Sequence, residues 1–211
     1  MAVSGLALFG FVIMHLLGNL LIFAGPEALN GYSEKLQSLG ELLWIARAGL
    51  IVMVLLHIWS GICLAQENRK ARPVSYQDKK NKRTIFAART MALSGLLLLS
   101  YIVFHLLHFT FKVTHPEISQ LLDAQGRHDV YSMVVLSFRE LPITAVYFFS
   151  MILLCLHLSH GFSSAFQTLG AANDDTLPQF QKMGRLISFA IFIGYAAIPL
   201  ACWFGIVKPI H

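Results

Sequence analysis

Five long apolar stretches dominate the sequence and limit what the chain can fold into. They lie at 3–24, 42–65, 86–111, 141–166 and 185–207. A helix needs about 20 apolar residues to cross roughly 30 Å of hydrocarbon, and each stretch meets that length. Only 13% of the residues are charged and the mean hydropathy is +0.63, so lipid is the expected solvent. We therefore predict a single all-α integral membrane domain over 1–211, with a bundle of four helices and a peripheral fifth.

The first stretch has the position of a signal peptide but not its composition. It has no basic segment before the apolar part, and it contains His15. We expect it to persist as a span of the mature protein.

Seven of the 16 basic residues are concentrated in one loop, which predicts the orientation. Residues 66–84 contain seven Lys or Arg, whereas the 25–41 loop contains Lys35 alone. By the positive-inside rule, the basic loop and the N-terminus are cytoplasmic and the C-terminus is external. The net charge of +5 therefore does not indicate nucleic-acid binding. A basic loop of this kind can instead contact anionic lipid or dock a soluble partner.

The cysteines give no sign of a disulfide framework or of covalently attached haem. The three of them, Cys63, Cys155 and Cys202, all lie in apolar stretches, and no CxxC pair occurs. Metal binding, if present, is therefore expected to depend on other side chains.

The first two spans resemble the third and fourth, and each of these four contains a histidine. Ser4-Gly5 precedes His15 at the same spacing at which Ser94-Gly95 precedes His105. The second and fourth spans share another pattern, with glycine four residues after histidine: His57 with Gly61, and His157 with Gly161.

The direction of each helix places these histidines at two depths. Odd-numbered spans run outward and even-numbered spans run inward, and all four meet their histidine late. His15 and His105 are thus expected in the outer half and His57 and His157 in the inner half, about 10–15 Å apart. Ionisable residues inside a membrane are costly and by default functional.

Two histidine pairs across a helical bundle indicate two bis-histidine haems of the b type. Histidine is the most frequent metal ligand, and bundle cofactors bind to side chains of facing helices. Gly61 and Gly161 would let a flat macrocycle approach the backbone, although close helix packing explains such glycines equally well. For the histidines themselves, the alternative is interhelical hydrogen bonding without a cofactor.

Taken together, these features resemble the dihaem cytochrome b subunit of the succinate dehydrogenase and fumarate reductase family. Two further similarities are Leu-Ser-Phe-Arg139 before the fourth span and Gly170, thirteen residues after His157. The resemblance implies that His15 and His105 bind the distal haem iron and His57 and His157 the proximal one. It also implies a flavoprotein and an iron–sulfur subunit at the cytoplasmic face of a bacterial inner membrane, with exchange of electrons with a quinone, which the dihaem class indicates to be menaquinone. Association into a higher oligomer of the complex is compatible with it.

Two nearby histidines complicate the choice of ligands, because His108 and His160 each follow a ligand by three residues. The Ser-Gly spacing selects His105, and the distance to Gly170 selects His157. We expect His108 one turn nearer the outer surface, where it suits a haem propionate, a quinone or simply the interface. Arg139 and Arg89, near helix ends, suit propionates or lipid headgroups.

The quinone site is expected at the outer ends of the first three spans, where a ring in lipid meets protonatable groups. By resemblance to the family, whose first external loop holds an essential glutamate, Glu34 is the choice for proton exchange, with Glu27 behind it. Solvated loop carboxylates are the alternative. The other candidates there are Asn30, Tyr32, Lys35, Arg47 and Lys112. Some family members have a glutamate two residues before the fourth ligand, assigned to a proton path; Cys155 stands here instead, so we expect that path to be absent.

Three other functions compete with this interpretation. A di-iron oxygenase would use the HxxH pairs at 105–108 and 157–160, but these lie in apolar helices and leave His15 and His57 unused. A transporter with histidine proton relays would favour carboxylates at mid-span, and no span has one. A quinone-linked cytochrome b of hydrogenase or formate dehydrogenase remains the alternative.

Overall fold

A computed structural model of the chain describes residues 1–71 and 90–210. Within these ranges, all regular structure is helical apart from an isolated β-bridge between Leu122 and His128. Five helical segments are long and apolar enough to cross a membrane. They are α1 (Ala2–Asn19) with its 3-10 extension η1 (Leu20–Ala24), α3 (Glu41–Lys70), α5 (Met91–His105) with the π-helical η2 (Leu106–Thr110), α7 (Leu141–Thr168) and α8 (Leu177–Trp203).

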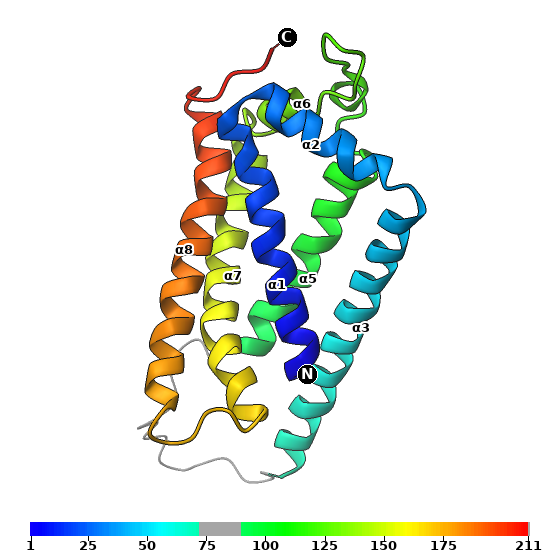
Figure 1. Cartoon of the computed structure of the whole chain (residues 1–211). Coiled ribbons are helices and arrows are strands. Elements are labelled where there is room, and N and C mark those ends of the chain that lie inside the picture. Colours follow the sequence, from blue (N-terminus) through cyan, green and yellow to red (C-terminus); the bar gives the residue numbers. More distant parts are fainter. Residues whose placement is uncertain (72–89, 211) are drawn as a thin grey trace.

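The chain is therefore an all-α, multi-pass membrane protein. The five segments run side by side, and the chain begins at one end of the bundle and finishes at the other (Figure 1). An odd number of spans has this consequence.

The spanning helices are longer than hydropathy predicted where their ends are polar. Helix α3 continues through Gln66–Lys70, and α8 begins eight residues before the predicted start at 185. Both additions are rich in Gln, Lys and Arg, which lower the hydropathy of a segment without weakening helix propensity. Pro178 near the start of α8 favours a helix start there, because its missing N–H would have no partner in the first turn.

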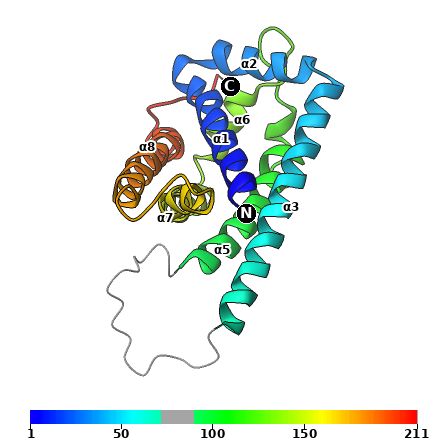
Figure 2. The same ribbon diagram turned by 60° about the horizontal axis from the view of Figure 1, so that its bottom comes forward.

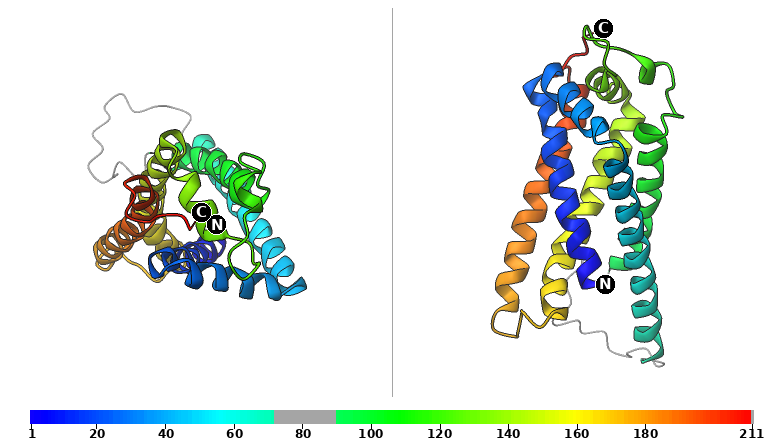
Figure 3. Two further views of the ribbon diagram at one scale, coloured as in Figure 1. Left: turned by 90° about the horizontal axis from the view of Figure 1, so that it is seen from above. Right: turned by 45° about the vertical axis from the view of Figure 1, so that its right-hand side comes forward.

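Helices α1, α3, α5 and α7 surround the centre of the bundle, and α8 lies outside them beside α7 (Figures 2 and 3). Small residues allow the close packing of α8. A Cβ at Gly184 would lie 2.9 Å from the backbone oxygen of Ser159, and one at Gly194 would lie 2.9 Å from Leu16. Such close approach at small residues is typical of membrane helices.

At the other edge of the bundle, α3 lies along α1 and has no buried residue. Its apolar surface is left uncovered by the rest of the described chain, in contrast to α7 and α8, which have many buried residues.

Two short helices and a loop close the end of the bundle where the C-terminus lies (Figure 1). We call this part the cap; it consists of α2 (Pro26–Ser38), the segment 111–129 with the 3-10 turn η3 (Ile118–Gln120), and α6 (Val130–Ser137). Below it lies the largest buried apolar cluster, which includes Val135, Tyr147 and Cys202. The cap thus rests on the bundle and holds its loops in fixed positions.

Candidate functional site

The four predicted histidines meet in two pairs inside the bundle. The rings of His15 on α1 and His105 at the end of α5 have their centroids 5.9 Å apart. The rings of His57 on α3 and His157 on α7 are 6.3 Å apart. The structure thus brings together the two pairs that the repeat predicted, and the first pair lies nearer the cap.

The spacing within each pair fits two axial ligands of one metal ion. A metal–nitrogen bond to histidine is about 2 Å long, so two imidazoles on opposite sides of one ion have ring centres about 6 Å apart. No group of three or more His, Cys, Asp or Glu residues suited to a metal occurs in residues 1–71 and 90–210. The facing histidines themselves form two pairs, and two protein ligands per ion would suit a macrocycle that supplies the other four.

One nitrogen of a histidine in each pair is held by a hydroxyl group. Ser94 Oγ lies 3.1 Å from His157 Nδ1, and the Tyr147 hydroxyl lies 3.2 Å from His105 Nδ1. A hydrogen bond at Nδ1 orients the ring and leaves Nε2 for a metal, as in most histidine–metal sites. By contrast, His57 Nδ1 is buried and has no hydrogen-bond partner within the described chain.

The repeated Ser-Gly pairs lie against the histidines of the neighbouring helices. A Cβ at Gly5 would be 3.3 Å from His57 Cε1, and one at Gly95 would be 3.5 Å from His157 Cε1. In the sequence these pairs only marked the repeat. In the structure they contact His57 and His157 on the neighbouring helices. Spacing within one helix could not reveal this role.

The glycines that follow His57 and His157 do not serve helix packing. A Cβ at Gly61 would come within 4 Å only of the Met1 side chain, at 3.7 Å, and one at Gly161 would meet no described atom within that distance. Helix packing would thus tolerate alanine at both positions. Contact with a flat cofactor stays a prediction.

His108 is buried, and both of its ring nitrogens are engaged. Nδ1 lies 2.9 Å from the Tyr147 hydroxyl and Nε2 lies 3.1 Å from Ser137 Oγ. A contact to a propionate or quinone stays a prediction and would require one of these bonds to open. His160 has a buried Nδ1 without a partner in the described chain, and the ring that faces His57 is that of His157.

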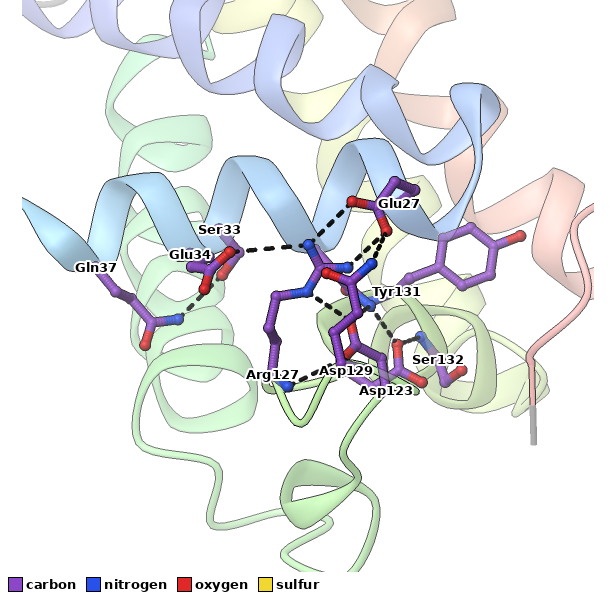
Figure 4. A network of polar contacts seen from close by, with 11 residues as sticks. Glu27, Ser33, Glu34, Gln37, Asp123, Arg127, Asp129, Tyr131 and Ser132 are labelled. Atoms are coloured by element: carbon purple, nitrogen blue, oxygen red, sulfur yellow. Dashed lines mark hydrogen bonds and ion pairs between the residues drawn. The ribbon is translucent and has the colours of Figure 1, made fainter.

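In the cap, Arg127 connects the predicted quinone residues (Figure 4). Its guanidinium donates to both carboxylate oxygens of Glu27, at 3.1 and 2.8 Å, and to Asp123 at 2.8 Å. Glu34 forms a longer ion pair with it, at 3.8 Å. Sequence reasoning missed Arg127, because one arginine in a polar loop has no pattern that would single it out.

This network keeps two carboxylates ionised. The hydrogen bond from Arg127 lowers the pKa of Glu27. Burial of Asp123 opposes its ionisation, but hydrogen bonds from the backbone N–H and guanidinium of Arg127 outweigh that effect and lower its pKa. The pKa of Arg127 is raised in turn by Glu27 and Asp123. Of the two predicted glutamates, Glu34 is less tightly bound and better suited to exchange a proton.

A cavity of about 460 Å³ lies beside this network, between α2 and the loop. It is lined by Leu21, Glu27, Ala28, Gly31, Tyr32, Glu34, Lys35 and Arg127. Four of the residues expected at the quinone site, namely both glutamates, Tyr32 and Lys35, thus share one hollow.

The remaining candidates lie elsewhere. Buried Asn30 donates to Asp129 at 3.0 Å and accepts from the Tyr131 N–H at 2.9 Å, so it joins α2 to α6. Arg47 stacks on Trp44 on α3. At the cap end, Arg139 is exposed and Lys112 is partly buried, and Arg89 lies outside the described residues.

No family model, curated protein or solved structure matches this chain. What can be said of its function depends on its motifs and its geometry.

Proposed function

We propose that this chain is the dihaem cytochrome b membrane anchor of a succinate:quinone or quinol:fumarate oxidoreductase. The observation that carries the proposal is that four histidines face each other in two pairs inside the apolar bundle. The ring centroids are 5.9 Å apart in one pair and 6.3 Å apart in the other. Bound haem b would supply one-electron transfer across this interior. His15 and His105 would hold one iron and His57 and His157 the other.

The surrounding side chains prepare the histidines for that role. Ser94 and Tyr147 occupy the Nδ1 atoms of His157 and His105, so that Nε2 remains available on each ring. All four histidines are partly buried among apolar helices, and such surroundings would strengthen binding of a hydrophobic cofactor. The space beside Gly61 and Gly161 supports the approach of a macrocycle.

The chemistry of quinone reduction favours a quinone site at the cap. A quinone takes up two electrons and two protons, so its site needs a protonatable group near the haem closer to the cap. Glu34 in the cavity of about 460 Å³ is proposed for proton exchange, and Arg127 and Lys35 would hold polar oxygens of the ring. His108 and Arg139, at the same end, are proposed as neighbours of the outer haem.

The other end of the bundle is proposed to face the cytoplasm. Arg69 and Lys70 end α3 there and continue into the basic segment 72–83, whose remaining residues are not described. Positive charge favours the cytoplasmic side of a bacterial inner membrane. The flavoprotein and iron–sulfur subunits would dock on this face, and the cap and C-terminus would be external.

Single His→Ala variants of the full chain test the ligand assignment. Variants at 15 and 105 should each lose the low-spin haem nearer the cap, and variants at 57 and 157 should each lose the other haem. The two haems are told apart by their different reduction potentials. His160→Ala is the matched control, because it removes a neighbouring histidine from the helix of His157 and should leave both haems bound. His108→Ala is the second control, which should keep both haems, with the outer one bound more weakly. Haem content per chain and the reduced-minus-oxidised spectrum are the measurements. Loss of haem in the controls, with retention in the four variants, would reject the assignment.

A further inference from the structure

A continuous row of hydrogen bonds leads from His105 to a backbone carbonyl on α6. His105 Nδ1 lies 3.2 Å from the Tyr147 hydroxyl, which lies 2.9 Å from His108 Nδ1. On the other side of that ring, His108 Nε2 lies 3.1 Å from Ser137 Oγ, which donates to the Met133 carbonyl oxygen at 2.7 Å. Three segments, α5–η2, α6 and α7, supply these groups.

The carbonyl at the end of the row fixes the direction of every bond in it. A carbonyl oxygen can only accept, so Ser137 gives it its single proton and must accept from His108 Nε2–H. A neutral imidazole has one N–H, so His108 Nδ1 is an acceptor and takes the proton of the Tyr147 hydroxyl. The tyrosine oxygen is then left to accept from His105 Nδ1–H.

Neutral rings are the consistent choice for this environment. His108 and Tyr147 are buried, and both nitrogens of His108 face hydroxyl groups rather than carboxylates. A charged imidazole without an anionic partner would be expensive in the membrane interior. In the neutral arrangement, every donor in the row has one acceptor, and the lone pair of His105 Nε2 stays outside the row.

We propose that Tyr147, backed by His108 and Ser137, holds His105 in the Nδ1–H tautomer, so that Nε2 carries the lone pair that binds iron. These three are positioning residues for the haem ligand nearer the cap. The inference extends the proposed function, because it assigns a task to His108 other than binding a ligand. It also separates the two levels, since the inner pair has Ser94 instead.

Tyr147→Phe is the direct test, with Tyr101→Phe as the matched control. Tyr101 stacks near both His105 and Tyr147, at ring distances of 5.9 and 5.3 Å, but no hydrogen bond joins its hydroxyl to either residue in the described structure. The Tyr147 variant should bind the outer haem about 10–100-fold more weakly. The potential of that haem should rise, because a ring that no longer donates from Nδ1 is a poorer electron donor to iron. The inner haem serves as the internal reference.

Retention of unaltered affinity and potential for the outer haem in Tyr147→Phe would overturn the proposal. If that variant does not fold, Ser137→Ala removes the acceptor of His108 Nε2–H and should show the same shifts in weaker form; no shift there would also overturn it.

A measurement without haem keeps the two proposals distinguishable. In the haem-free full chain, ¹⁵N NMR of labelled histidines should show His105 protonated at Nδ1, and Tyr147→Phe should populate the Nε2–H form. A wild-type chain that binds no haem would reject the proposed function alone, whereas His105 protonated at Nε2 in the wild type would reject the inference.

Discussion

Hydroxyl groups divide the four central histidines into two kinds. His105 and His157, both from the second half of the repeat, have Nδ1 next to Tyr147 and Ser94. For the first half, the described chain offers no such hydroxyl partner, and His57 Nδ1 is buried and unpaired. Ser4 donates to the Met1 carbonyl oxygen just as Ser94 donates to that of Met91, but only Ser94 also bonds a histidine. In the proposed function, the rings on the α5–α7 side are therefore already oriented, and those on the α1–α3 side would adjust on cofactor binding.

This difference predicts unequal effects of two equivalent serine substitutions. Ser94→Ala removes the partner of His157 Nδ1 and should weaken haem binding at the inner level about 10–100-fold. Ser4 occupies the same place in the repeat but forms no hydrogen bond with a histidine in the described structure, so Ser4→Ala should leave haem binding unchanged. Haem transfer to an acceptor protein in excess measures both. Equal losses in the two variants would show that the hydroxyl acts on the helix rather than on the ring.

At the scale of elements, α2 is held in place by charge as well as by the apolar packing of Leu29. Arg127 joins Glu27 on α2 to Asp123 in the loop (Figure 4). Asn30 joins α2 to α6. Because Glu27 and Asp123 are acids whose pKa values are lowered in the folded protein, folding favours their ionised forms. Their contribution to stability is complete above their ordinary values near pH 4 and is lost as the pH falls through the lowered values.

The protection of α2 amides against hydrogen exchange should therefore stay constant between about pH 5 and 8. It should fall only below about pH 4, where the carboxylates become protonated. Exchange has to be corrected for its intrinsic pH dependence. In Arg127→Gln, the acid-induced change should be much smaller, because the neutral amide does not favour ionised carboxylates. Lys35→Gln is the control, as it removes a nearby charge that forms no ion pair with Glu27 in the described structure. Loosening of α2 near pH 6 in the wild type would contradict this account.

The parts of these elements that the sequence predicts are those with a repeating pattern. Hydropathy located the five spans, but it missed the start of α8 at Leu177–Gly184. It also missed the short helices, because α2 is polar like a loop and α6 has only eight residues. The Ser-Gly spacing predicted which histidines face each other. It could not predict Tyr147, Ser137 or Arg127, because each contributes one polar group from a different helix or loop, and only the packing brings them to their partners.

For the whole molecule, the arrangement is a bundle with unequal sides. Helices α7 and α8 pack closely, whereas α3 lies at the edge without a buried residue (Figures 2 and 3). Such a looser side would suit the proposed cofactors between α1, α3, α5 and α7. The polar cap closes one end, and the basic end of α3 marks the other, so that in the proposed function electrons would enter at the basic end and meet protons at the cap.

The most direct test of the central claim is a haem count and redox titration of the purified full chain. We predict two b-type haems per 23.5 kDa chain, both low-spin with two histidine ligands, that are reduced at two distinct potentials. A chain that is folded and helical in detergent but binds no haem, or binds a single high-spin haem, would contradict the account.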